Sequence, residues 1–456
     1  MTAAKGDFSQ GKVSSLILRL GLPIMLAELV HVLYNIVDRM YIGHLPGDEG
    51  TLALTGLGVC FPLITLIGAF ANLSNTGGAT LSTIARGEGD DERAGRIMAT
   101  AFTFLLIVGG TLTVLLYVTA PWTLRLLGGS EETLPYALSY FRIYVLGSIP
   151  VLISLGMNAF INAQGFPRVG MMTVILGAAL NIGLDPLFIY AFGMGVRGAA
   201  LATVLSQTVS ALWVLRFLTG KRPPVRLRRL GIDRVQLGRI VGLGVTGFTF
   251  KVTNSVTQAI VNVMLRAWGG LLSDLYIGAM SLINSMREIM SLPINGVTQG
   301  GQAVMSYNYG ARLFRRVSDG IRFVLLGGIV INTLMWVMVM FFPQPLVRAF
   351  TDDAALAALT VRCARIYFGA FPFMALQVTG QHTFVALNHP RHALFFSTLR
   401  KLILVAPLTL LLPGLGLGVE GVFWAEFISQ LVGASACFTT MYFVIWKKMR
   451  RSADPA

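Results

Sequence analysis

Long apolar stretches are the sequence feature that most constrains how this chain can fold. A helix needs ~20 mostly apolar residues to cross the ~30 Å hydrocarbon layer of a bilayer. Short loops rich in Gly, Pro and charge separate about a dozen such stretches. Because 54% of the residues are hydrophobic and only 12% are charged, a soluble protein of this length is excluded. The sequence predicts an all-α membrane protein with spans at 16–42, 53–76, 97–120, 135–161, 169–192, 197–218, 238–267, 276–305, 321–342, 358–387, 394–412 and 417–446.

The net charge of +15 is unevenly distributed along the chain. Most Lys and Arg residues fall in alternate loops and in the two tails, which is the pattern of loops that face the cytoplasm. We therefore predict a multi-pass protein of the plasma or inner membrane with both termini in the cytoplasm. Topology explains the basic excess, so nucleic acid is not an expected partner, whereas the lipid bilayer is.

The sequence repeats itself when it is shifted by a constant 223 positions without a gap. Matches extend over most of the chain, for example Gly21 with Gly244, Arg142-Ile143-Tyr144 with Arg365-Ile366-Tyr367, and Pro167-Arg168 with Pro390-Arg391. Two halves with an even number of spans enter the membrane from the same side, so the repeats are parallel. We predict an N-lobe of six transmembrane helices (1–220), a basic cytoplasmic linker (221–237) and a six-helix C-lobe (238–456) around a central cleft.

Polar side chains line one face of the first span. Glu28, His31, Asn35 and Asp38 have helical spacing, and ionisable groups inside a span are functional candidates by default. The alternative is that Asp38 lies at the outer interface and pairs with Arg39.

The fifth span carries a second polar group. Asn181 and Asp185 are one turn apart, and Pro186 frees a backbone carbonyl nearby. Carboxylate, amide and hydroxyl oxygens suit a hard cation such as Na⁺, and a poorly hydrated carboxylate can equally carry a proton. The spacing does not choose between the two ions.

The second half offers further candidates for residues that line the cleft. Lys251 occupies the repeat position of Glu28, so the two could approach each other in one state of the protein, or each could pair within its own lobe. The other candidates are polar or flexible side chains of the seventh and eighth spans, namely Asn254, Gln258, Arg287, Glu288, Met286 and Met290. Arg287 and Glu288, like Arg400 and Lys401 in the eleventh span, could instead be packing or interfacial residues.

These residues resemble the MATE (multidrug and toxic compound extrusion) family. The resemblance covers nearly the whole chain and rests on Pro23 with Asn35-Ile-Val-Asp38, on Asn181-Ile-Gly-Leu-Asp185-Pro186, on the stretch 293–311 and on Gly418-Val419-Glu420-Gly421. It implies twelve helices in two lobes and the antiport of cationic, often aromatic compounds against H⁺ or Na⁺.

The resemblance also implies roles for single residues. The cation site of the N-lobe would consist of Asp38, Asn181, Asp185 and Thr203, with Asn158 in its polar network, and Na⁺ could bind to the first four. Pro23 would be the point at which the first helix bends. The carboxylates that some branches of the family carry in the second half are missing here, where Lys251 and Met374 stand.

We therefore expect a secondary active antiporter that exports small organic cations by alternating access and functions as a monomer. No cofactor beyond the coupling ion, no resident metal and no enzymatic activity are expected, because neither a catalytic motif nor a metal-ligand cluster occurs. The alternative is a flippase for lipids or lipid-linked sugars from the same broader superfamily. A passive channel is disfavoured because there is no filter-like motif.

Overall fold

The computed structural model describes residues 7–45 and 49–453, and these residues form helices without any strand. The outermost residues of the predicted cytoplasmic termini, 1–6 and 454–456, lie outside this range. The described chain packs into two compact units. The N-unit contains Leu26–Phe248, and the C-unit contains Phe8–Met25 together with the chain from Thr249 onward.

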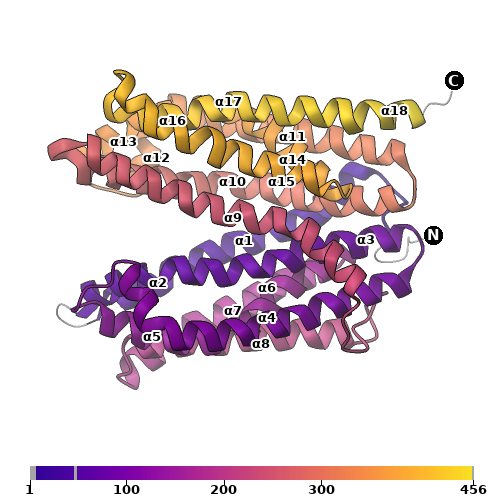
Figure 1. Cartoon of the computed structure of the whole chain (residues 1–456), viewed down its shortest axis with the longest axis horizontal. Helices are drawn as coiled ribbons and strands as arrows, with labels where there is room; N and C mark the ends of the chain where they lie inside the picture. Colours follow the sequence, from indigo (N-terminus) through magenta and orange to yellow (C-terminus); the bar gives the residue numbers. More distant parts are fainter. Residues whose placement is uncertain (1–6, 46–48, 454–456) are drawn as a thin grey trace. The chain divides into compact units, whose positions relative to one another are not determined.

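The helices of the N-unit lie side by side along a common direction (Figure 1). Most are long and apolar, as membrane spans must be. In chain order they are α1 (Val13–Gly43), whose first half belongs to the C-unit, α2 (Glu49–Asn72), the π-helical turn η1 (Leu73–Ala79), α3 (Thr80–Gly87), α4 (Asp91–Leu126), α5 (Leu134–Leu146), α6 (Ser148–Ala163), α7 (Pro167–Pro186), the π-helical turn η2 (Leu187–Ala191) and α8 (Val196–Thr219).

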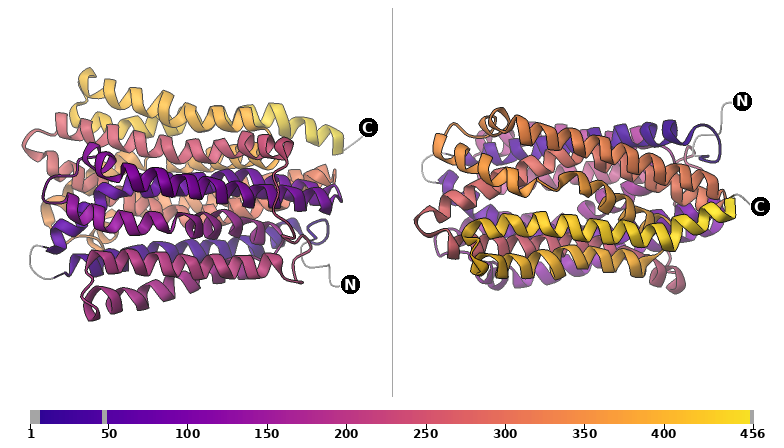
Figure 2. Two further views of the ribbon diagram at one scale, coloured as in Figure 1. Left: turned by 60° about the horizontal axis from the view of Figure 1, so that its bottom comes forward. Right: turned by 90° about the horizontal axis from the view of Figure 1, so that it is seen from above.

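The helices of the C-unit are aligned with one another in the same way (Figure 2). They are α9 (Arg234–Trp268), whose first half belongs to the N-unit, α10 (Ser273–Gly310), α11 (Phe314–Phe341), α12 (Pro343–Arg348), α13 (Ala354–Tyr367), α14 (Met374–Ala386), α15 (Pro390–Thr398), η5 (Leu399–Val405), α16 (Ala406–Leu411), α17 (Gly421–Met441), η8 (Tyr442–Trp446) and α18 (Lys447–Ala453). Short 3-10 turns, η3 (Gly270–Leu272), η4 (Phe371–Phe373), η6 (Leu412–Leu415) and η7 (Gly418–Glu420), join several of them.

The backbone confirms the internal repeat. The bent pair α5 and α6 (57°) corresponds to the bent pair α13 and α14 (49°) at the same register. Backbone conformations recur as well, because the left-handed turn at Gly89 (φ 81°) returns at Arg312 (φ 58°), and that at Gly165 (φ 87°) returns at Asn388 (φ 57°). A non-glycine residue in this region is uncommon, so the second half has kept the turn geometry without the glycine.

The predicted class of a twelve-helix membrane protein is confirmed. Among the described residues, eight helices are long and apolar enough to span a bilayer, and each of the two bent pairs adds one more. The remaining two are α9 and α10, which have 35 and 38 residues and are therefore long enough. Their mean hydropathy is lower because α9 carries Lys251 and α10 carries Arg287 and Glu288. The two most polar spans are thus the first two of the second repeat.

Two helices pass from one unit to the other at equivalent places. In α1 the change occurs between Met25 and Leu26, and in α9 it occurs between Phe248 and Thr249, at matching positions of the repeat. The first half of α1 packs closely on α10, with Gly21 against Gly296. The first half of α9 packs on η1 in the same manner. Small residues allow such close approach of helix backbones.

Replacement of Gly300 by Ala should destabilise the contact between α1 and α10. A Cβ atom at this position would lie 2.6 Å from the carbonyl oxygen of Ile17, and backbone atoms cannot move aside as a flexible side chain can. We expect a cost of about 1–3 kcal/mol, measured as a lower temperature of unfolding in detergent. Gly242→Ala in α9 is the matched control, because a Cβ atom there would have no neighbouring atom within 4 Å. Equal stability of both variants would contradict the prediction.

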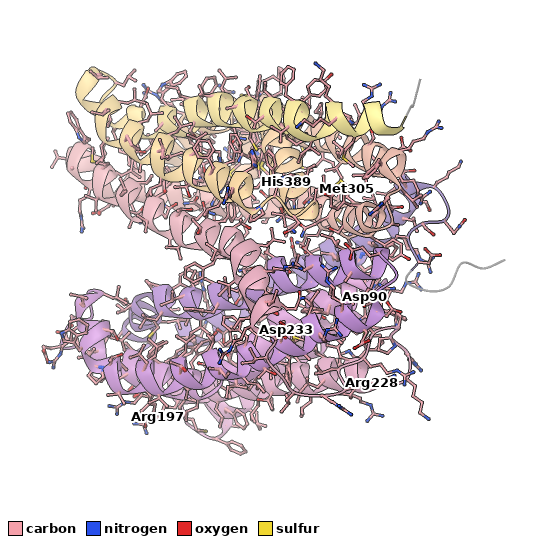
Figure 3. The ribbon with its side chains drawn as sticks, turned by 45° about the vertical axis from the view of Figure 1, so that its right-hand side comes forward. Asp90, Arg197, Arg228, Asp233, Met305 and His389 are labelled. Carbon is pink, nitrogen blue, oxygen red and sulfur yellow. The ribbon has the colours of Figure 1, made fainter. Side chains whose placement is uncertain are left out.

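The segment between the repeats is anchored to the N-unit. The amide of Val225 donates to Gln164 Oε1 (2.9 Å), and the amide of Asp233 donates to Thr100 Oγ1 (3.1 Å). Asp233 in turn accepts hydrogen bonds from the first amides of α9, as an N-cap residue does. Figure 3 labels Asp233 and, on α4, the corresponding cap Asp90. The predicted linker is therefore an ordered part of the N-unit up to the start of α9.

Candidate functional site

A pair of carboxyl groups lies at the centre of the candidate site in the N-unit. Asp38 comes from α1 and Asp185 from α7, and their carboxyl groups lie beside each other. Asp185 is fully buried and Asp38 is 9% exposed. Two carboxylates in contact repel each other unless a proton or a cation lies between them. The geometry therefore favours binding of a proton or a cation between the two carboxyl groups.

Asn181 and Thr203 complete this group. Asn181 lies one turn before Asp185 on α7, and its Nδ2 donates both to Asp185 Oδ1 (3.3 Å) and to Thr203 Oγ1 of α8 (3.4 Å). The hydroxyl of Thr203 donates to its own helix at Ala199 O (3.0 Å). The four predicted cation-site residues thus come together from three helices.

Several oxygen atoms of this site have no hydrogen-bond partner. Asp38 Oδ1, Asn181 Oδ1 and Asp185 Oδ2 are buried and unpaired. Arg39 does not neutralise Asp38 by a contact within 4 Å, and its guanidinium instead lies over the ring of Phe61 at 5.4 Å. Hard cations such as Na⁺ prefer oxygen ligands of this kind, and a proton can satisfy one carboxyl oxygen equally well. The residues present fit either ion.

Tyrosine and amide side chains surround the carboxyl pair, and the sequence reasoning did not include them. The hydroxyl of Tyr34 lies near Gln207, whose Oε1 accepts from Ser154 Oγ (2.6 Å). Tyr140 of α5 lies near Thr203. The signal was helical spacing, because Tyr34 lies one turn before Asp38 and Gln207 lies one turn after Thr203.

Asn158 connects helices at some distance along α7 from the carboxyl pair. Its Nδ2 donates to Gly170 O (3.1 Å), and its Oδ1 accepts from Thr173 Oγ1 (3.1 Å). Both partners lie in the first half of α7, two or more turns before Asn181. These contacts tie α6 to α7 and thereby position the helix that carries Asp185.

The other predicted residues of the first span are more accessible. Glu28 is half-buried and His31 is exposed. Asn35 donates to the carbonyl of His31 (2.8 Å), so its amide is partly used within its own helix. Pro23 lies inside α1, shortly before the point at which this helix passes between units.

In the C-unit the structure separates the predicted cleft residues into different environments. Lys251 and Glu288 are exposed, whereas Met286 and Met290 are buried in the hydrophobic core of this unit. Gln258 accepts from Asn284 Nδ2 (3.0 Å) and donates to Asn262 (3.1 Å).

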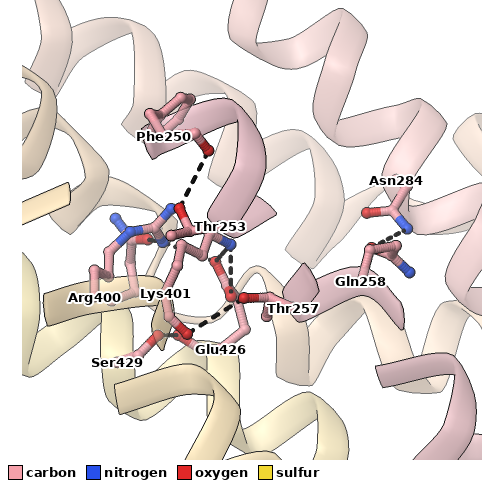
Figure 4. Close-up of polar contacts among 10 residues, drawn as sticks. Phe250, Thr253, Thr257, Gln258, Asn284, Arg400, Lys401, Glu426 and Ser429 are labelled. Carbon is pink, nitrogen blue, oxygen red and sulfur yellow. Dashed lines mark hydrogen bonds and ion pairs between the residues drawn. The ribbon is translucent and has the colours of Figure 1, made fainter. Parts of the chain in front are cut away.

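A buried ionic cluster occupies the interior of the C-unit (Figure 4). Glu426 of α17 accepts from Arg400 Nη1 (2.8 Å) and from Lys401 Nζ (3.2 Å to each oxygen). Arg400 also donates to Gln430 Oε1 (2.6 Å). Sequence reasoning left the role of Arg400 and Lys401 open and missed Glu426. The signal was the opposite charge of these residues in the last two spans, since buried charges need partners.

A small pocket of about 30 Å³, enough for about one or two water molecules or a single carboxylate group, borders this cluster. It is lined by Asn254, Thr257, Gln258, Val261, Met280, Arg287, Tyr367, Lys401, Val405, Val422 and Glu426. Three predicted cleft residues, Asn254, Gln258 and Arg287, thus lie at one pocket. Its position corresponds to that of the carboxyl site in the other repeat, because Glu426 is the equivalent of Thr203 and Val261 is the equivalent of Asp38.

Comparison with known proteins gives one consistent result. The protein-family model described as MatE matches residues 23–187 and 252–411. These two segments lie at equivalent positions of the internal repeat and together cover more than half of the chain.

Curated relatives match over nearly their full length. The multidrug export protein MepA of Staphylococcus haemolyticus is 23% identical over 454 residues, with 98% of this chain and 97% of the relative covered. MepA of Staphylococcus aureus is 24% identical over 448 residues, with 95% of each chain covered. Among solved structures, an outward-facing multidrug resistance MATE transporter superposes with a TM-score of 0.90 at 23% identity, covering 99% of this chain and 100% of the other. At this identity the structural likeness establishes the fold.

Proposed function

Since this chain belongs to the MATE family, we propose that it is a secondary active antiporter that exports organic cations in exchange for H⁺ or Na⁺. The observation that carries the proposal is the contact between the buried carboxyl groups of Asp38 and Asp185. Such a pair binds a small cation and changes its net charge when it does so. The names of the MepA relatives, which describe multidrug export, support the direction of transport and the breadth of substrates.

Each residue of the carboxyl site has a role in this proposal. Asp38 and Asp185 carry the charge that the coupling ion neutralises. Asn181 holds Asp185 through its Nδ2 and offers its unpaired Oδ1 to the ion. Thr203 adds a hydroxyl oxygen from α8.

Coupling requires only that the ion and the organic cation disfavour each other's binding. A coupling free energy of ~1–3 kcal/mol is typical between two sites. Both ligands are cations, so a proton or Na⁺ at the carboxyl pair removes the negative charge that attracts the organic cation. The ion that enters therefore favours release of the substrate on the outer side.

A change in the course of α1 is the proposed mechanical step. Asp38 lies on this helix, and Pro23 interrupts its backbone hydrogen bonds shortly before the helix passes between units. Neutralising Asp38 changes how the second half of α1 packs against α7. We further propose that the protein functions as a monomer in the plasma or inner membrane. Its basic loops support a cytoplasmic position for both termini.

Uptake of a fluorescent organic cation by inverted proteoliposomes tests the proposal. We expect rhodamine 123 to accumulate under an imposed pH gradient or an imposed Na⁺ gradient, and collapse of that gradient by an ionophore should stop the accumulation. The gradient that drives uptake identifies the coupling ion. Absence of uptake under both gradients would refute the proposal, provided that a thermal unfolding measurement shows the protein to be folded.

A further inference from the structure

The C-unit contains more buried positive charge than negative charge. Among the described residues, Arg400 and Lys401 of η5 are buried beside Glu426, and the half-buried Arg287 of α10 lines the same pocket. Arg400, Lys401 and Glu426 are each less than 10% exposed. Buried cations are costly unless they are paired, so the distribution of partners among them is informative.

Glu426 is already occupied by two of the three cations. One of its oxygens accepts from Arg400, and both oxygens accept from Lys401. No carboxylate of the described residues lies within 4 Å of the guanidinium of Arg287, and the neighbouring Glu288 is exposed. Arginine remains charged at any physiological pH. The pocket therefore retains a cation that has no carboxylate of its own.

The unpaired charge faces a pocket that also offers neutral donors and apolar walls. Arg287 and Lys401 line it together with the amides of Asn254 and Gln258. Apolar side chains supply the rest of the lining, namely Val261, Met280, Val405 and Val422. A pocket of this size with convergent donors fits a carboxylate group, and the rest of an organic ligand would lie outside it.

Comparison of the repeats shows that most charged side chains at this pocket have the opposite sign to those at the carboxyl site of the N-unit. Val261 stands where the N-unit has Asp38, and Leu408 stands where it has Asp185. Conversely, Arg400 and Lys401 replace Gly177 and Ala178. The position that binds a cation in one half has thus lost its acids and gained bases in the other half.

We propose that this pocket of the C-unit binds the carboxylate of an organic molecule, with Arg287 as its main partner and Lys401 as the second. The inference rests on the proposed function and extends it from simple cations to substrates that also carry a carboxylate. A planar guanidinium matches a carboxylate through two parallel hydrogen bonds.

A pair of dyes that differ only at the carboxyl group provides the test. Rhodamine 110 has a free carboxylate, and rhodamine 123 is its methyl ester. Binding of each dye to the purified full-length protein in detergent is measured by fluorescence anisotropy. We expect Arg287→Gln to weaken binding of rhodamine 110 by about 10-fold or more, while binding of rhodamine 123 changes by less than about 2-fold.

A second variant covers the case in which Arg287→Gln does not fold. Asn254→Asp places an acid of nearly the same shape at the lining of the pocket, where it competes with the ligand for the unpaired cation. This variant should also weaken binding of rhodamine 110 by about 10-fold without weakening that of rhodamine 123. Arg322→Gln, an exposed arginine of α11 outside this pocket, is the control that should leave both dyes unaffected.

The outcomes separate this inference from the proposed function. Equal effects of Arg287→Gln and Asn254→Asp on both dyes, or no effect on either, would overturn the anion pocket. Rhodamine 123 export that still depends on Asp38 would in that case leave the proposed antiport intact. Loss of rhodamine 110 binding in both variants, with rhodamine 123 unaffected, would support the pocket whichever ion drives transport.

Discussion

Asp38→Asn should abolish ion-coupled export and leave the protein folded. Asparagine has nearly the same shape as aspartate but can neither carry the charge nor release a proton. With a coupling free energy of ~1–3 kcal/mol at stake, we expect the gradient-driven uptake rate of rhodamine 123 to fall by about 10-fold or more. The measurement is uptake into inverted proteoliposomes under the gradient that drives the native protein.

Two further variants show whether the two carboxyl groups act as one site. Asp185→Asn should reduce uptake as strongly as Asp38→Asn, and the double variant should be no worse than either single one, because groups that share one ion are not additive. Glu92→Gln is the matched control, since this acid of the N-unit is exposed and forms a surface ion pair with Arg96. Retention of full coupled uptake in Asp38→Asn would remove the carboxyl pair from the mechanism.

Glu426→Gln should strongly destabilise the C-unit. The substitution leaves Arg400 and Lys401 buried without a carboxylate, and removing one partner of a buried ion pair typically costs ~3–5 kcal/mol. We expect a markedly lower unfolding temperature in detergent and a lower yield of folded protein. The amide of Gln430, which accepts from Arg400, cannot replace the lost charge.

Glu420→Gln provides the comparison for this prediction. Glu420 also forms an ion pair, with Arg362, but the arginine side chain is 69% exposed. Water and salt screen such pairs, so their loss costs only ~0–1 kcal/mol. Similar stability of the two glutamine variants would show that the cluster around Glu426 is hydrated in the folded protein, and it would weaken the argument for an uncompensated cation beside it.

The overall architecture could be predicted from the sequence because it depends on local and periodic features. Membrane spans follow from runs of apolar residues, and the repeat follows from matches at one constant shift, neither of which requires knowledge of distant contacts. The paired bends at Gly147 and after Tyr367 were not predicted. The chain stays apolar across each bend, so the hydropathy of the fourth and tenth spans does not reveal where the helix breaks.

The candidate site in the N-unit was predicted in part. Helical spacing placed Asn181 and Asp185 on one face, and the family resemblance added Thr203. The approach of Asp38 to Asp185 and of Tyr34 to Gln207 brings together helices that are far apart in the chain. The spacing of residues within one helix does not indicate which other helix packs against that face.

The sequence by itself determined the membrane-spanning class, the number of helices and the twofold repeat of this protein, since each depends on composition and register along one chain. Only the tertiary structure decided that α1 and α9 divide between the units and that Glu426 meets Arg400 and Lys401. It also decided that Arg287 has no carboxylate within contact distance among the described residues. The partner of a buried charge is set by three-dimensional packing, because the cost of an unpaired charge depends on what surrounds it and not on its neighbours in sequence.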